Sequence, residues 1–188
     1  MSGQSKAKRV LSVKRIIVIV ILFSILFGGL KTVLRFSQGV YMDDIWNFRS
    51  NKIWYDRIAN MLMEIYDGEK EKYSNLSYIY LGAENDTNWT VECVVNDDIH
   101  DKYSYEISLT VSAEMCEAMK RIAERLYFDY HGEVGSIVTV SKQWVAFDSN
   151  GFAFVRTRDM NMPPHNTYKM RKITYSEMIS FGWFLIAN

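Results

Sequence analysis

Cys93 and Cys116 are the two cysteines of the chain, and their positions would allow a disulfide. Cys93 lies on the apolar side of an alternating segment and Cys116 on the apolar flank of a helical one, which places both at one helix–sheet interface. In an oxidising compartment they could close a loop of about 24 residues, worth ~3 kcal/mol in the chain-entropy model. Two buried thiols are the alternative, since cysteine is among the most buried residue types.

A group of potential metal ligands, Asp97, Asp98, His100 and Asp101, lies between two strand-like segments. Carboxylates and an imidazole could in principle bind a divalent cation. A calcium loop, however, spaces its ligands around a required glycine and ends in a glutamate, and this segment has neither feature. The sequence therefore favours a solvated turn here, and no metal ligand is assigned.

Catalytic motifs are missing from the sequence. It contains no GxSxG, HExxH, Walker or GxGxxG pattern, and His131 and His165 are isolated. Neither cysteine has a metal-ligand residue at two-residue spacing. The sequence thus disfavours an enzyme and implies no cofactor.

Four cations near the C-terminus form the second candidate site. Arg156 and Arg158 lie two residues apart in one predicted strand, and Lys169 and Arg171 do so in another. Pairing of the two strands would bring all four onto one face. Such a face could bind an acidic partner, anionic lipid headgroups or the protein's own acidic residues, and the alternative is an ordinary solvated strand face.

Charge is distributed unevenly along the chain. The first 35 residues carry seven Lys or Arg and no acid, while all 22 Asp and Glu follow from Asp43 onward, against 15 Lys or Arg. The net charge of residues 36–188 is therefore negative, and such a domain would repel a polyanion. Nucleic-acid binding is disfavoured.

The N-terminal segment predicts a membrane anchor at Ile16–Leu34. Fifteen uncharged residues, Ile16–Leu30, are followed by Lys31, whose ammonium can reach the headgroups while Leu34 remains in the span. Nineteen helical residues cover about 28 Å, close to the ~30 Å hydrocarbon thickness. Five cations precede the span, so residues 1–15 are expected to form a cytoplasmic tail and residues 36–188 an extracytoplasmic domain.

A cleaved signal peptide is the competing interpretation of the same segment. Ser37-Gln38-Gly39 has small residues where cleavage would occur, but Lys31 and Arg35 separate it from the apolar run. A buried core helix is disfavoured because the run has no polar face. The uncleaved anchor is therefore the favoured prediction, with membrane lipid as its partner.

Periodicity predicts two helices in the domain. Apolar residues at three- and four-residue steps indicate a helix from about Asp44 to Asp67, which Gly68 would end. Ser112 can cap a second helix that Gly132 would stop. Its buried stripe is expected to comprise Met115, Met119, Ile122, Leu126 and Tyr130.

Alternating and β-branched residues predict the strands. The expected strands are Leu76–Leu81, Trp89–Val95, Tyr103–Leu109, Ser136–Phe147, Phe152–Arg158, Tyr168–Thr174 and Trp183–Ile186. The turn residues 148–151 would join two of them as a hairpin, and residues 160–167 would form a loop. This order, with short connections, predicts an α+β domain in which two helices pack on one face of an antiparallel sheet.

These features together predict a non-enzymatic interaction module anchored in a membrane, for instance a subunit of an envelope-associated assembly with a protein partner. An extracytoplasmic ligand-binding or sensor domain is the main alternative, and an unrecognised hydrolase is a third. A short basic tail offers little for signalling output, which disfavours a sensor.

Overall fold

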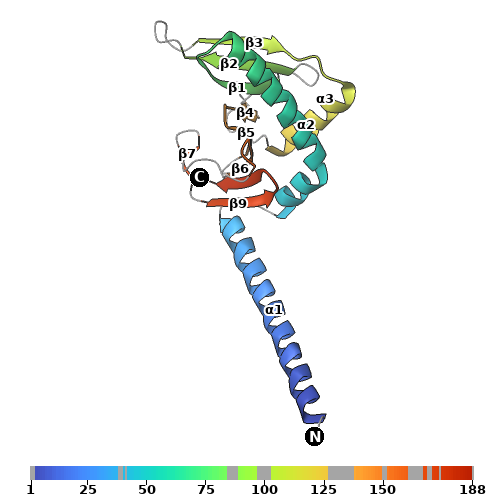
Figure 1. Cartoon of the computed structure of the whole chain (residues 1–188). Coiled ribbons are helices and arrows are strands. Elements are labelled where there is room, and N and C mark those ends of the chain that lie inside the picture. Colours follow the sequence, from blue (N-terminus) through green and yellow to red (C-terminus); the bar gives the residue numbers. More distant parts are fainter. Residues whose placement is uncertain are drawn as a thin grey trace.

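A computed structural model provides the structure of the chain (Figure 1). It describes residues 3–37, 40, 42–83, 89–96, 103–126, 138–149, 152–160, 167–168, 171–173 and 175–187. Within these ranges only the backbone is described for residues 3–14, 83, 123–126, 167–168 and 171–172.

Helix α1 (Gly3–Ser37) projects from the domain as a single long rod (Figure 1). Its segment Arg15–Ser37 is 23 residues long, strongly apolar, and has no buried residue in its apolar window. The hydroxyls of Ser24 and Thr32 donate to the carbonyls of Val20 and Gly28, so both are satisfied within the helix. The helix is therefore long and apolar enough to span a membrane, and it contains the predicted segment Ile16–Leu34.

Helix α2 (Met42–Lys72) supplies one layer of the domain. Asp43 and Asp44 lie in its first turn, where carboxylates stabilise the positive end of the helix dipole. Its buried face comprises Ile45, Phe48, Tyr55, Ile58, Ala59, Leu62, Tyr66 and Glu69. These residues recur at steps of three, four and seven, so one stripe of the helix packs on the sheet.

The helix continues past Gly68, where the sequence predicted its end and a loop over residues 68–72. Glu69 explains the difference, because its carboxylate accepts hydrogen bonds from Lys72 and from Tyr105 on the sheet, both at 2.7 Å. Lys70 then donates to the carbonyls of Ser74 and Leu76, which stabilises the turn into the first strand. Tertiary contacts thus outweigh the weak helix preference of Gly68.

The sheet contains eight strands in the order β3-β2-β1-β4-β5-β6-β10-β9, and each pairs antiparallel with its neighbours. The strands are β1 (Leu76–Ala83), β2 (Trp89–Val95), β3 (Tyr103–Ser108), β4 (Val138–Val140), β5 (Trp144–Asp148), β6 (Phe152–Thr157), β9 (Tyr175–Ser180) and β10 (Trp183–Ala187). Together with the packed helices this confirms the α+β prediction. β7 (Thr167–Tyr168) and β8 (Arg171–Lys172) form a separate two-stranded sheet.

Two strand predictions are wrong in detail. The predicted strand Ser136–Phe147 is divided into β4 and β5, because the Ser141 hydroxyl accepts from the amides of Gln143 and Trp144 and makes a tight turn. The predicted strand Tyr168–Thr174 instead contains the end of β7 and all of β8, which pair with each other. Strand β9 was not predicted from the sequence.

Helix α3 (Ala113–Leu126) begins where the sequence predicted, since the Ser112 hydroxyl accepts from the Met115 amide at 3.2 Å. Met119 and Ile122 are buried in the main core and Met115 is half-buried against it. The side chain of Leu126 and residues 127–137, including Tyr130 and Gly132, lie outside the described part. α3 packs against α2, so the stripe contributes to the core between the two helices and the sheet.

The central strands are buried on both faces. Phe147, Phe154, Trp183 and Leu185 face α2 in the main core. The alternate residues Ala146, Ala153, Val155, Phe184 and Ile186 form a second core on the opposite face, against which Ile173 packs. Strands β6 and β10 are therefore buried along nearly their whole length, as is typical of strands covered on both faces.

Candidate functional site at the junction of helix and domain

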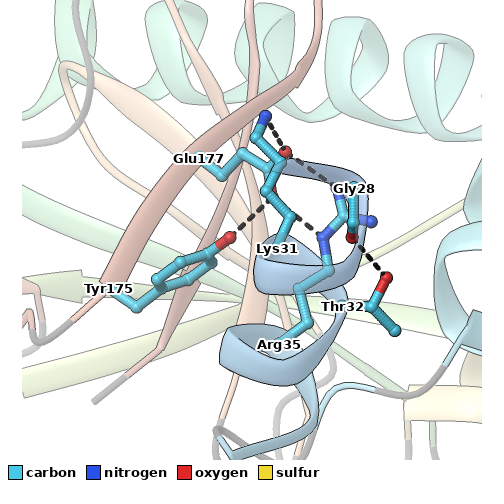
Figure 2. Close-up of polar contacts among 6 residues, drawn as sticks. All are labelled: Gly28, Lys31, Thr32, Arg35, Tyr175 and Glu177. Carbon is cyan, nitrogen blue, oxygen red and sulfur yellow. Dashed lines mark hydrogen bonds and ion pairs between the residues drawn. The ribbon is translucent and has the colours of Figure 1, made fainter. Parts of the chain in front are cut away.

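Four polar residues join the end of α1 to the edge strand β9, and we call them the junction cluster: Lys31, Arg35, Tyr175 and Glu177 (Figure 2). Arg35 donates from Nε and Nη2 to the two carboxylate oxygens of Glu177, both at 2.8 Å. Lys31 Nζ donates to Oε1 at 3.0 Å, and the Tyr175 hydroxyl donates to Oε2 at 2.6 Å. One carboxylate thus accepts four hydrogen bonds from two elements far apart in sequence.

Helical and strand geometry bring these residues together. Lys31 and Arg35 are four residues apart and lie on one face of the last turns of α1. Tyr175, Glu177 and Ile179 alternate along β9 with the exposed Ser176 and Met178 and share the half-buried side. Glu177 therefore points toward the cations (Figure 2).

The Arg35–Glu177 pair is largely shielded from solvent, since the two side chains are only 13% and 12% exposed. A bidentate guanidinium–carboxylate pair fixes both distance and orientation. Lys31 is 49% exposed and adds less, because solvent screens an exposed charge. Arg35 is therefore the cation that chiefly holds β9 against α1.

The electrostatics of the cluster favour the ionised carboxylate. Burial alone would raise the pKa of Glu177, but hydrogen bonds from Arg35, Tyr175 and Lys31 outweigh it and lower that pKa to about 2. Burial and the hydrogen bond to Glu177 both raise the pKa of Tyr175, which keeps its hydroxyl protonated as a donor. The cluster is an electrostatic clamp with a charged acceptor and fixed donors.

The pKa of Glu177 predicts how the clamp responds to acid. Because it lies below the ordinary value of 4.5, the stabilisation is fully present above pH 4.5 and is lost as pH falls toward about 2. We expect a carbon-13 titration of the Glu177 carboxyl, in micelles, to have its midpoint near pH 2.

Variants of the two cations separate their contributions. Arg35→Met should raise the pKa of Glu177 markedly, and Lys31→Met should raise it less, because Lys31 is more exposed. An ordinary glutamate midpoint in the unmodified protein would mean that the clamp does not form.

Arg156 lies on β6 and Arg158 directly follows that strand, and both pair with acids of α2. Arg156 Nη1 donates to the carbonyl oxygen of Asp56 at 3.2 Å and to Asn60 Oδ1 at 2.8 Å. Arg158 forms a two-bond pair with Asp67 at 2.9 and 2.7 Å. The sequence suggested an acidic partner, anionic lipid headgroups or the protein's own acidic residues as partners of these cations. In the structure, Arg156 and Arg158 contact acidic residues of the same chain.

The strand pairing assumed for the four-cation face does not form. Strand β6 lies between β5 and β10, and β8, which contains Arg171, pairs with β7. The backbone of Arg171 is described but its side chain is not, and Lys169 lies outside the described residues. Arg156 and Arg158 are therefore not joined to Arg171 by strand pairing.

The two cysteines both contact the main core, as the sequence predicted. Cys93 is buried and Cys116 is half-buried. The structure has no disulfide between them, and their pairing in an oxidising compartment stays a prediction. Burial is the main factor that raises the pKa of Cys93, which keeps the thiol protonated and a weak nucleophile. Its neighbour Tyr105 donates to Glu69 at 2.7 Å.

The predicted turn with Asp97, Asp98, His100 and Asp101 lies outside the described residues, as do His131 and His165. Within the described ranges, no group of three or more His, Cys, Asp or Glu is placed to hold a metal ion.

Glu177 was not among the candidate site residues predicted from the sequence. The feature of the sequence that could have indicated it is a carboxylate between Tyr175 and Ile179, on the inward side of an alternating segment. A carboxylate at such a position needs a cation or several donors. The two cations that follow the apolar run, Lys31 and Arg35, were therefore candidates, but only the fold brings them close.

Comparison of the chain with protein-family models, with curated proteins and with solved structures finds no match.

Proposed function

We propose that this chain is a single-pass membrane protein that holds a non-enzymatic interaction domain in a fixed pose at the membrane surface. The junction cluster carries this proposal. A flexible tether would need no contact between anchor and domain, yet Arg35 and Glu177 form a shielded two-bond pair at the end of the apolar helix. The pair restricts the angle between α1 and the domain.

The charge pattern supports an orientation for this proposal. Five cations precede the apolar run and would keep residues 1–15 in the cytoplasm, with residues 36–188 on the other side. The acidic composition of the domain is compatible with a protein partner and not with nucleic acid.

The end of the domain formed by β1–β3 lies far from α1 (Figure 1) and is the surface we assign to a protein partner. Strand β3 is an edge of the sheet, which leaves its outer backbone groups able to pair with an added strand. Tyr73, Tyr78 and Tyr103 are exposed by about two fifths in this part of the chain. Tyrosine is enriched in protein interfaces because it offers apolar area and a polar tip.

Protease accessibility tests the topology. Protease added outside intact cells should digest residues 36–188 and spare the tail, while the chain should resist extraction from membranes by alkaline carbonate. Protection of the whole domain would reverse the orientation, and release of the chain by carbonate would exclude the anchor.

Site-specific photo-crosslinking tests the interaction surface. A photoreactive side chain at Tyr103 should give a discrete adduct in intact membranes, and the same group at Glu64, exposed on α2, should not. Equal adduct patterns at both positions would contradict a partner surface at β3.

A further inference from the structure

Large apolar side chains are exposed at the end of the domain that adjoins α1, and we call them the exposed apolar rim: Phe36, Met42, Trp46 and Phe181. Trp46 is 70% exposed and Phe181 67%, which are the highest values among the large hydrophobic side chains that the structure describes beyond α1. Exposing two aromatic rings to water costs free energy in proportion to their apolar area. We therefore expect another surface to cover them.

The segments that carry Trp46 and Phe181 lie close together in the fold. Trp46 and Phe181 each lie two residues from a buried ring, and those rings, Phe48 and Trp183, have centroids 5.1 Å apart. The first turns of α2 and the turn between β9 and β10 therefore lie together. Gly182 makes that turn with a φ of 72°, in the left-handed region that favours glycine, and it leaves Phe181 at the tip.

The rim also adjoins the end of the apolar helix. Phe36 is in the last turn of α1, and the Val40 amide donates to the Arg35 carbonyl at 3.0 Å. Met42 begins α2 directly afterwards. Phe181 follows Glu177 by four residues, about 13 Å of strand, and Glu177 is paired with Arg35.

We infer that the exposed apolar rim contacts the interfacial region of the same bilayer that α1 spans, so that the domain rests on the lipid. This inference rests on the proposed membrane anchor. Lipid is the occupant because the rim begins at Phe36 in the last turn of α1, and because the junction cluster holds β9 beside the helix end. Tryptophan and phenylalanine are typical of side chains at the boundary of headgroups and acyl chains.

Tryptophan fluorescence provides the test, because all five tryptophans lie beyond α1. The full chain would be placed in phosphatidylcholine nanodiscs whose upper acyl carbons carry bromine, a contact quencher. We expect lower emission than in unbrominated discs. Trp46→Phe should lose most of this quenching, and Phe181→Trp in the Trp46→Phe background should restore it.

Trp89→Phe is the matched control, since Trp89 is buried on β2, which four strands separate from β10 in the sheet. It should retain the quenching. Equal emission in both kinds of disc, with the protein still bound to them, would overturn the inference while the anchor stands, and would favour a protein on the rim. Unchanged quenching in Trp46→Phe would also overturn it. Failure of the chain to remain with the discs would refute the anchor and the inference together.

Discussion

Replacing Phe48 with alanine is expected to lower the free energy of unfolding by about 3–5 kcal/mol. Phe48 is fully buried, and its ring packs against those of Tyr55, Phe154 and Trp183 at 4.8–5.1 Å between centroids. Truncation would remove one of the contacts that join α2 to β6 and β10 and would leave a cavity. Domains of this size have a total stability of roughly 5–15 kcal/mol, so much of it would be lost.

Denaturant titration of the chain in detergent micelles, followed by near-ultraviolet circular dichroism, measures this effect. Arg49→Ala is the matched control, because Arg49 is the next residue of α2 and is exposed. It should change the free energy of unfolding by less than about 0.5 kcal/mol. Equal effects of the two substitutions would mean that α2 packs on the sheet with a different face.

Replacing Glu177 with glutamine should loosen the junction without unfolding the domain. The variant keeps the shape of the side chain but removes the charge that accepts from Arg35, Lys31 and Tyr175. Hydrogen bonds to charged groups are worth about 1.5–3 kcal/mol, so opening at the end of α1 should become roughly tenfold more frequent or more.

Amide hydrogen exchange detects this change residue by residue. Exchange at residues 33–37 should accelerate in Glu177→Gln, while the amides of β5 and β6 should keep their protection. Glu64→Gln is the control, since Glu64 lies exposed on α2, and it should alter neither set. Unchanged exchange at the end of α1 in Glu177→Gln would show that the pair does not hold the junction.

Local patterns in the sequence predicted the helices and the first strands well. The apolar run at Ile16–Leu34 lies within α1, and the strand Trp89–Val95 is found with the same bounds. These elements carry their own signal, since a long uncharged run favours a helix and clean alternation favours a half-buried strand. The α+β class followed from their order.

Elements whose form depends on tertiary contacts were harder to predict. The helix passes Gly68 because Glu69 contacts Tyr105 in β3, a residue 36 positions away. Strand β9 carries a glutamate and two serines, so its composition resembled that of a loop.

The junction cluster could not be predicted because its two halves are 142 positions apart, between Arg35 and Glu177. The sequence also could not show that Arg156 and Arg158 contact Asp56 and Asp67, since many acids were available to them. In both cases the charges were visible, and the fold determines which of them meet.

The fixed pose of the domain on its anchor is tested most directly by a distance measurement in a bilayer. Nitroxide labels would be attached at Leu22→Cys in α1 and at Lys142→Cys in the turn between β4 and β5, with Cys93 and Cys116 replaced by alanine. Double electron–electron resonance would then measure the distance between the two labels. Both labelled positions are exposed. We expect one narrow distance distribution in nanodiscs, which broadens when Glu177→Gln is added. A broad distribution before that change would contradict a fixed pose of the domain on α1. An equally narrow distribution after it would show that Glu177 does not fix that pose.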